Sequence, residues 1–393
     1  MKIFTIVGAR PQFIKAAAVS RAIAAHNIIS GDIKACVQEV LVHTGQHFDD
    51  NMSNIFFSEL GINKPAYHLG IHGCGHGEMT GRMLIGIEKV LLEQKPDIVL
   101  VYGDTNSTLA GALAAVKLHV PIAHVEAGLR SFNMIMPEEI NRILTDRLST
   151  MLFCPTDTAV MNLLREGLCQ SSYLHASDVM QRIPCMEPFV CNVGDVMYDV
   201  SLYYGAQVKE TSGILGTLSK SNGLKPGSYC LATIHRAENT DNPERLRNIF
   251  AALCEFSKDV PVVIPLHPRT RKILESLDPG IAGIDTGTLI IIEPVGYLDM
   301  VQLEKFAALI ATDSGGVQKE AFFYGVPCVT LRDETEWVEL VDSGWNCLAP
   351  PADKDQILSS LQSSIGSRGL DVKPFGTGDA SDQIVTHLLS HFI

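Results

Sequence analysis

Length, composition and charge exclude several classes of protein. The chain has 393 residues, of which 46% are apolar and 19% charged, so we expect a folded protein with two domains of ordinary size rather than a disordered chain. Its 31 Lys and Arg residues against 44 Asp and Glu residues give a net charge of −13, which argues against a general nucleic-acid-binding protein.

The first half of the chain alternates short apolar runs with longer segments of helical periodicity, which is the pattern of a parallel sheet wrapped by helices. Strands are predicted at 3–7, 40–43, 97–102, 121–125 and 151–153. Helices are predicted from Pro11 onward and at 78–93, 105–118, 138–148 and 156–166. The segment 169–190 has no clean period, so we predict a connecting loop there and place the domain boundary at about 170–190.

The second half predicts another α/β set. Its segments are 229–234, 243–258, 260–265, 289–292, 303–312, 315–324 and 327–331, with a last helix at 379–391. The Ser- and Gly-rich segment 210–227 is predicted to be an exposed connection. The expected fold class is therefore α/β, with two doubly wound Rossmann-like domains, 1–175 and 190–372, facing a cleft where a ligand binds.

The cysteines and the apolar runs indicate a cytoplasmic protein. No two of the ten cysteines have C-x-x-C spacing, and several, such as Cys154 and Cys328, stand inside apolar runs. Reduced, buried thiols explain them better than disulfides do. The run 3–7 is too short for a signal-peptide core, and no other run reaches the roughly 18 apolar residues of a membrane span. We expect no membrane partner.

The end of the first predicted strand carries a weak signal for binding an anion. The strand 3–7 leads into Gly8-Ala9-Arg10-Pro11, where Arg10 at a helix N-terminus can meet a phosphate or a carboxylate. The alternative is a turn glycine followed by a surface arginine. Lys15, one turn on, is either a second cation at the same place or a solvated helical lysine.

A stronger anion signal follows the predicted strand 308–312. Asp313-Ser314-Gly315-Gly316 opens a helix, so backbone N–H groups and a hydroxyl point at one spot with the helix dipole behind them. Glu320, one turn on, suits the hydroxyls of a ribose. Because the chain has no P-loop lysine and no G-x-G-x-x-G motif, an ordinary strand–helix turn stays open beside a nucleotide-diphosphate site.

Three carboxylates stand near the ends of predicted strands. Asp104 follows the strand 97–102, Glu126 follows the strand 121–125, and Glu138 comes directly after Pro137. Asp104 can instead cap the helix at 105, and Glu138 with Arg142 can be a simple ion pair on one helix. Several carboxylates around one cleft are what general acid–base catalysis needs.

Two histidines also follow predicted strands. His235 and His267 stand with the arginines 236, 269 and 271; facing a cleft, such residues bind a pyrophosphate and stabilise it as a leaving group. As isolated residues they are ordinary loop residues. The histidines of His72-Gly73-Cys74-Gly75-His76 match no common zinc spacing, so we interpret this segment as a Gly-rich loop and expect no metal site.

Six short motifs occur in a characteristic order. They are Gly8-Ala9-Arg10-Pro11-Gln12, Gly103-Asp104-Thr105, Val125-Glu126-Ala127-Gly128-Leu129-Arg130, Pro137-Glu138-Glu139-Ile140-Asn141-Arg142, His235-Arg236-Ala237-Glu238-Asn239 and Thr312-Asp313-Ser314-Gly315-Gly316. This set resembles the bacterial UDP-N-acetylglucosamine 2-epimerase family over about residues 1–350. The resemblance implies a fold like that of B-type glycosyltransferases (GT-B), with a last helix at about 376–393 returning to the first domain.

The resemblance also implies a reaction. The family eliminates UDP across C1–C2 of a UDP-2-acetamido sugar and adds it back with the opposite configuration at C2. By resemblance, Asp104, Glu126 and Glu138 are acid–base candidates, and Lys15, Arg142 and His235 stabilise charge at the leaving group. The positions that match UDP-binding residues are Arg10, His267, Met300, Ser314, Gly315, Gly316 and Glu320. The family implies a homodimer and no cofactor.

Some runs are similar to one branch of the family. The runs 8–15, 131–134 and 331–337 resemble the branch that acts on UDP-2,3-diacetamido-glucuronate for O-antigen synthesis, so the partner is UDP-GlcNAc or this uronate. Gln12 stands where Glu is usual in the family. Three functions stay open: a non-hydrolysing 2-epimerase, a hydrolysing relative that releases UDP and a free 2-acetamido-mannose sugar, and a glycosyltransferase or UDP-sugar sensor on the same fold.

Overall fold

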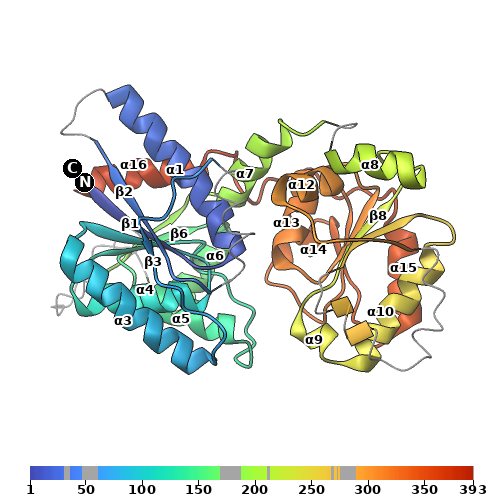
Figure 1. Cartoon of the computed structure of the whole chain (residues 1–393), viewed down its shortest axis with the longest axis horizontal. Helices are drawn as coiled ribbons and strands as arrows, with labels where there is room; N and C mark the ends of the chain where they lie inside the picture. The colour runs from blue at the N-terminus through green and yellow to red at the C-terminus, as the bar shows by residue number, and fades with distance from the viewer. Residues whose placement is uncertain are drawn as a thin grey trace, which may run out of the picture. The chain divides into compact units, whose positions relative to one another are not determined.

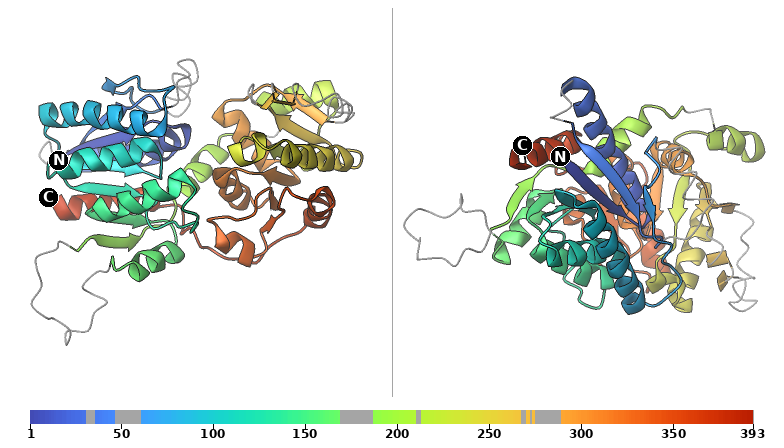
Figure 2. Two further views of the ribbon diagram at one scale, coloured as in Figure 1. Left: turned by 90° about the horizontal axis from the view of Figure 1, so that it is seen from below. Right: turned by 60° about the vertical axis from the view of Figure 1, so that its left-hand side comes forward.

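The structure is a computed structural model that describes residues 1–30, 36–46, 61–168, 187–209, 213–266, 270–271, 273–274 and 289–392. The chain forms two compact units (Figure 1). The first comprises Met1–Val200 and Lys373–Ile393, and the second comprises Ser201–Val372. The first unit thus runs beyond the predicted end at 175, and the two chain termini lie close together on it (Figure 1 and Figure 2).

The first unit contains a seven-stranded sheet in the order β3-β2-β1-β4-β5-β6-β7, in which every neighbouring pair is parallel. Its strands are β1 (Lys2–Val7), β2 (Gln38–His43), β3 (Tyr67–His68), β4 (Ile98–Tyr102), β5 (Ile122–Val125), β6 (Met151–Cys154) and β7 (Phe189–Asn192). The strand order reverses direction at β1, where β2 lies on one side and β4 on the other. In a doubly wound sheet, a ligand binds beside such a switch point.

Helices cover both faces of this sheet (Figure 1). They are α1 (Arg10–Ser30), α3 (His76–Gln94), α4 (Asn106–Lys117), α5 (Pro137–Leu148), α6 (Asp157–Arg165) and α16 (Ala380–Phe392). Helix α7 (Val196–Gly205) begins in the first unit and ends in the second. Helix α16, formed by the end of the chain, contacts α1. On the opposite face, Phe4, Ile6, Val99 and Val101 of the central strands pack against residues of α3 and α4.

The second unit contains a six-stranded sheet in the order β10-β9-β8-β11-β12-β13, again with parallel neighbours. Its strands are β8 (Cys230–Thr233), β9 (Val262–Pro265), β10 (Leu289–Ile292), β11 (Leu309–Thr312), β12 (Cys328–Thr330) and β13 (Asn346–Leu348). Its helices are α8 (Gly213–Asn222), α9 (Ala237–Thr240), α10 (Pro243–Phe256), α12 (Tyr297–Lys305), α13 (Gly315–Phe323), α14 (Val338–Asp342) and α15 (Lys354–Ser364).

Two apolar clusters show that both faces of the second sheet are covered. Ala232 and Ala311 pack in a cluster with α10 and α15, whereas Leu231 and Ile310 pack in another with α8, α12 and α13. Successive residues of a strand point to opposite faces, so a strand buried on both faces reads as a continuous apolar run. The predicted α/β class with two doubly wound sheets is confirmed.

Two local predictions were wrong. Part of the predicted loop 169–190 is strand β7, and residues 169–186 lie outside the described part of the chain. The predicted connection 210–227 contains helix α8, whose Leu215 and Leu218 are buried. Two glycines and two serines stand among the other residues of α8, and this composition is typical of a loop rather than of an apolar helix face.

The predictions about the cysteines and about membrane-spanning segments can be compared with the described part of the structure. Among the described residues, no cysteine forms a disulfide, and the cysteines at 154, 230, 254 and 328 are buried; Cys169 and Cys185 lie outside the described residues. In the described part of the chain, no helix is both long enough and apolar enough to cross a bilayer.

Candidate active site

In the first unit, two tight turns at the carboxyl ends of β4 and β5 carry candidate carboxylates. Gly103, which precedes Asp104, has a φ of +60°, and Glu126 has a φ of +73°. A non-glycine residue rarely adopts this left-handed region, and it persists only where its surroundings hold it there. Because β4 and β5 are parallel neighbours, their ends place Asp104 and Glu126 at one edge of the sheet.

Glu126 forms a buried ion pair with Lys15 of α1. The Lys15 ammonium contacts Glu126 Oε2, and the two side chains are 8% and 9% exposed. Lys15 is therefore not a solvated helical lysine, which was the alternative that its position in the sequence left open. A carboxylate held against an ammonium in a nearly dry site is a group that can exchange a proton with a substrate.

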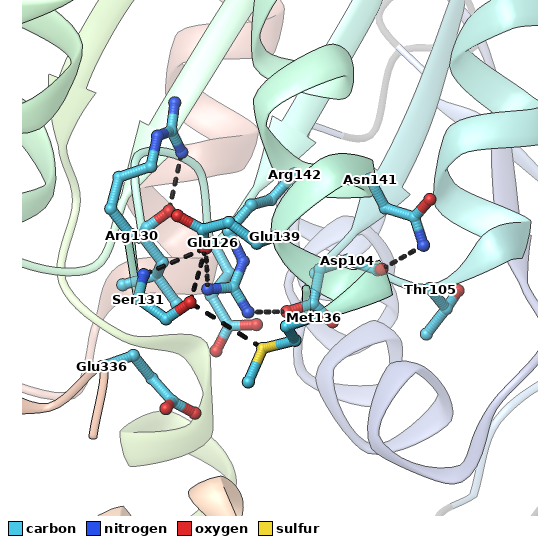
Figure 3. A network of polar contacts seen from close by, with 12 residues as sticks. Asp104, Thr105, Glu126, Arg130, Ser131, Met136, Glu139, Asn141, Arg142 and Glu336 are labelled. Atoms are coloured by element: carbon cyan, nitrogen blue, oxygen red, sulfur yellow. Dashed lines mark hydrogen bonds and ion pairs between the residues drawn. The ribbon is translucent and has the colours of Figure 1, made fainter. Parts of the chain in front are cut away.

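Asp104 contacts Arg142 of α5, as Figure 3 shows, with 2.5 Å between Asp104 Oδ2 and Arg142 Nη2. The alternative that Asp104 caps α4 is wrong, because the side chain of Thr105 accepts the hydrogen bond from the Thr108 N–H. Asn141 adds a hydrogen bond of 2.9 Å from its amide to Asp104 O. The Asp104 carboxylate is 29% exposed, so a ligand can reach it.

The partner of Arg142 within α5 is Glu139, whereas Glu138 is exposed. Arg142 Nη1 lies 2.8 Å from Glu139 Oε2, and the suggested Glu138–Arg142 pair is not formed. Glu139 also accepts hydrogen bonds from the Ser131 N–H and hydroxyl and from the Phe132 N–H (Figure 3). These bonds hold Phe132 at a φ of +59°. Sequence reasoning missed Glu139, since a glutamate in a first helical turn is an ordinary feature.

In the second unit, Asp313 organises the turn that carries His235. Its fully buried carboxylate accepts hydrogen bonds of 3.1 Å from the backbone N–H groups of His235 and Arg236 and from the Asn239 side chain. The His235 ring itself is 54% exposed, with Nδ1 3.5 Å from Asp313 Oδ1. The structure therefore brings the predicted residue His235 to the end of β8, beside the turn between β11 and α13.

The turn 313–316 leads into α13 as the sequence predicted. Ser314 is its N-cap residue, and its hydroxyl accepts from the Val317 N–H. A Cβ atom on Gly315 would lie 2.4 Å from Glu336 Oε1, so a larger residue here would displace the Glu336 carboxylate. Glu336 is held by Arg332 at 3.0 Å, and neither residue was a candidate from the sequence.

The remaining predicted binding residues are scattered within their units. Glu320 is buried in α13 and accepts a long hydrogen bond of 3.4 Å from the Tyr297 hydroxyl. Burial, followed by the charge of Glu320, raises the pKa of Tyr297 well above its usual value, so this hydroxyl stays a donor. Met300 is half-buried on α12, and Arg10 is the first residue of α1.

Some residues named in the sequence analysis lie outside the described part of the chain, and others belong to no group of possible metal ligands there. His267 and Arg269 belong to the segment 267–269, which the structure does not describe. His76 lies 3.2 Å from the Asn106 amide. Among the described residues, no three His, Cys, Asp or Glu side chains stand together as metal ligands would.

Comparison with known proteins identifies the family to which the chain belongs. The family model described as UDP-N-acetylglucosamine 2-epimerase matches residues 32–389. The chain belongs to this family. It is 53% identical to the UDP-2,3-diacetamido-2,3-dideoxy-D-glucuronate 2-epimerase of Pseudomonas aeruginosa, with 99% of each chain covered. It is 43% identical to the UDP-N-acetylglucosamine 2-epimerase of Methanocaldococcus jannaschii, with 98% of each covered.

A solved structure supports the same assignment. The crystal structure of the M. jannaschii UDP-GlcNAc 2-epimerase in complex with UDP-GlcNAc and UDP matches with a TM-score of 0.84 and 42% identity, and the match covers 99% of this chain and 100% of the other. The family resemblance inferred from the motifs, the GT-B-type architecture and the classification as an isomerase are confirmed.

Proposed function

We propose that the protein is a non-hydrolysing UDP-sugar 2-epimerase whose preferred substrate is UDP-2,3-diacetamido-2,3-dideoxy-glucuronate. The observation that carries this choice is 53% identity over nearly the whole chain to a protein with that named substrate, against 43% to a UDP-N-acetylglucosamine 2-epimerase. Both relatives are named 2-epimerases, which favours epimerisation over glycosyl transfer or sensing. In this proposal the product serves surface-polysaccharide synthesis.

The chemistry explains why paired carboxylates and cations are needed. The C2 hydrogen is not next to a carbonyl, so its direct removal is very hard. In the proposed reaction a base takes the C2 proton while the C1–O bond breaks and its electron pair leaves with UDP, which forms a 2-acetamidoglucal. UDP then adds back at C1, and C2 receives a proton on its opposite face. Two faces require acid–base groups in two places.

The first unit supplies the acid–base groups in this proposal. Asp104, Glu126 and Glu138 exchange protons with the sugar, and Lys15 and Arg142 stabilise negative charge. The buried contact of Glu126 with Lys15 and the contact of Asp104 with Arg142 support these roles, since a nearby cation favours the carboxylate form that acts as a base.

The second unit supplies most of the UDP site. Ser314, Gly315 and Gly316 at the start of α13 receive the diphosphate, where the helix dipole favours an anion. Glu320 and Met300 bind the nucleoside, and His235 supports the leaving group. In the same proposal, Arg10 and His267 also bind the UDP moiety.

Proton NMR in D2O tests the proposal. The purified protein is incubated with UDP-2,3-diacetamido-glucuronate and, in parallel, with UDP-GlcNAc. We expect deuterium at C2 and a UDP-linked manno product, at a higher kcat/KM for the uronate. A faster reaction with UDP-GlcNAc would reassign the substrate. Release of free sugar with UDP would identify a hydrolysing enzyme, and neither exchange nor product would refute an epimerase.

Two further expectations belong to the proposal. We expect a homodimer, because exposed apolar residues lie on α3 (Ile85 and Leu92) and on α5 (Ile140 and Leu144). We place the enzyme in the cytoplasm, since buried thiols such as that of Cys154 suit a reducing compartment. The reaction needs no cofactor in this scheme, because UDP leaves and returns, the proton lost from C2 is replaced by another, and nothing is oxidised or reduced overall.

A further inference from the structure

One histidine connects the two turns that carry Asp104 and Glu126. His124 lies on β5 with its side chain fully buried. Its Nδ1 atom lies 2.7 Å from Asp146 Oδ1, and its Nε2 atom lies 2.7 Å from Gly103 O. The carbonyl oxygen of Gly103 can only accept a hydrogen bond, so Nε2 carries a hydrogen.

The surroundings of Asp146 show that the other ring nitrogen donates as well. Asp146 Oδ2 accepts from Arg130 Nη1 at 2.7 Å and from the Gly128 N–H at 3.2 Å. A carboxylate that collects these donors is ionised, so His124 Nδ1 also carries a hydrogen. Both ring nitrogens then donate, which is the doubly protonated form of the ring.

The charges of this buried cluster balance. Arg130 Nε lies 2.6 Å from Glu166 Oε1, so the cations of His124 and Arg130 face the anions of Asp146 and Glu166. Burial acts to lower the pKa of Arg130, but hydrogen bonds to Glu166 and the charge of Asp146 outweigh it and raise that pKa. A compensated cluster of this kind is rigid, and it is costly to break by removing one partner.

The cluster reaches both candidate carboxylates through the backbone. Gly103 O belongs to the peptide group that joins Gly103 to Asp104. The hydrogen bond from the His124 ring therefore fixes the orientation of this peptide plane, and with it the position from which the Asp104 side chain extends. Gly128 N–H belongs to the turn that begins with the left-handed Glu126. Holding a non-glycine residue in that region costs free energy, and the bond from the Gly128 N–H to Asp146 is one of those that hold the turn.

We propose that His124 is a positioning residue of the epimerase, which fixes Asp104 through Gly103 O and the Glu126 turn through Asp146. The inference rests on the proposed function, because Asp104 and Glu126 act as acid and base only in that scheme. His124 is fully buried and contacts other protein groups, so it acts through them rather than on the sugar.

Two conservative variants separate the two links. In His124→Asn the amide N–H₂ takes the place of Nδ1, so the bond to Asp146 is retained and the bond to Gly103 O is lost. In His124→Gln the amide takes the place of Nε2, so the bond to Gly103 O is retained, while Asp146 still binds Arg130 and Gly128. Each variant loses one of the two bonds and the ring charge, and because Asn is one methylene group shorter than Gln, the melting temperature of each variant is measured beside its activity.

We expect kcat to fall by about 100-fold in His124→Asn, as a small misplacement of a catalytic group does, and by less than about tenfold in His124→Gln. KM and the Kd for UDP should be alike in the two variants, and the difference in kcat should exceed what their melting temperatures account for. Equal losses of kcat, or losses that follow the melting temperature, would overturn the proposal.

A measurement on the unaltered protein covers the case in which a variant does not fold. With ¹⁵N-labelled histidine, NMR should show one ring with two slowly exchanging N–H protons, both absent from His124→Gln. A single protected N–H in the unaltered protein would overturn the inference. If the unaltered protein converts no UDP-sugar, the proposed function fails, and the ring protons still report on the cluster.

Discussion

At the scale of single residues, Gln12 shows how much one amide determines beside the candidate site. Its Oε1 atom accepts from the backbone N–H groups of Gly8 and Ala9, at 2.8 and 3.0 Å. Its Nε2 atom donates to Tyr102 O at 2.8 Å and to the Thr108 hydroxyl at 2.9 Å. The amide thus joins the turn after β1 to the end of β4, and it needs both an acceptor and a donor.

We expect Gln12→Glu to destabilise the protein by about 1–3 kcal/mol, because a buried carboxylate offers no donor to Tyr102 O. Urea unfolding at pH 7 measures the change. Gln207→Glu, at an exposed glutamine, is the matched control and should change the free energy of unfolding by less than about 0.5 kcal/mol. An unchanged stability of Gln12→Glu would mean that the site adapts to a carboxylate.

Substitutions at Glu126 and Lys15 allow the effect on stability to be measured separately from the effect on proton exchange at C2. Glu126→Gln leaves the Lys15 charge buried without its partner, so we expect a loss of about 3 kcal/mol in the free energy of unfolding. The double variant Lys15→Met/Glu126→Gln removes both charges and should regain much of that stability. Deuterium exchange at C2 should stay reduced by about 10²-fold or more in both. Recovery of exchange in the double variant would exclude Glu126 as an acid–base group.

Much of the candidate site could be predicted because it follows strands directly. Asp104, Glu126, His235 and Ser314 each stand just after an apolar run, and an apolar run is visible in a sequence. His124, Asp146 and Glu139 were missed for a physical reason. A buried charge in a strand or helix looks ordinary until its partner is known. The partners of His124 and Asp146 are distant in the chain, as Gly103 is from His124, whereas Glu139 resembles any glutamate in a first helical turn.

At the scale of elements, the central strands were the most predictable part of the fold. Both faces of β4 and β11 are covered, so β4 is apolar throughout and β11 is apolar up to Thr312, its last residue. Edge and peripheral elements gave weaker signals: β3 has only two residues, and α8 has few buried positions. The apolar residues Ile384 and Leu388 of α16 are buried, but the sequence of this helix did not show which surface they cover, because partners such as Asp199 of α7 are distant in the chain.

Asp199 binds the first turn of α16 and makes this docking sensitive to pH. Its carboxylate accepts from the Ser381 hydroxyl at 2.5 Å and from the N–H groups of Ser381 and Ala380 at 2.8 and 3.2 Å. Burial, the largest influence, raises the pKa of Asp199, although the bonds from Ser381 and Ala380 lower it. A carboxyl whose pKa is raised on folding stabilises the fold below its ordinary pKa, and this contribution is lost as the pH rises through the raised value.

We therefore expect the unaltered protein to gain stability relative to Asp199→Asn as the pH falls from about 7 toward 4. Urea unfolding of both proteins at several pH values in this range measures the difference. Asp382→Asn, at an exposed position in the same helical turn, should show no such slope. A constant difference between the unaltered protein and Asp199→Asn, or one that shrinks at low pH, would contradict the raised pKa.

At the scale of the whole molecule, each unit completes its own core, yet two helices of the first unit, α3 and α5, carry exposed apolar residues on the face that they share with α4. Ile85 and Leu92 of α3 are 54% and 57% exposed, and Ile140 and Leu144 of α5 are 40% and 44% exposed. Helix α4 contacts both α3 and α5, so these residues flank it on one face of the sheet. Isolated apolar residues are normal on a surface, but grouped ones indicate an interface.

We expect this face to form the homodimer, with a mass of twice 42.8 kDa by light scattering after gel filtration. Ile85→Glu and Leu144→Glu place a charge in the proposed interface, so each should shift the protein toward the monomer, because an unpaired charge is costly to bury. Ile28→Glu, at an 82% exposed residue of α1, introduces the same change on the opposite face of the sheet and should leave the mass unaltered. A monomeric unaltered protein, or variants that remain dimeric, would show that a second copy does not cover α3 and α5.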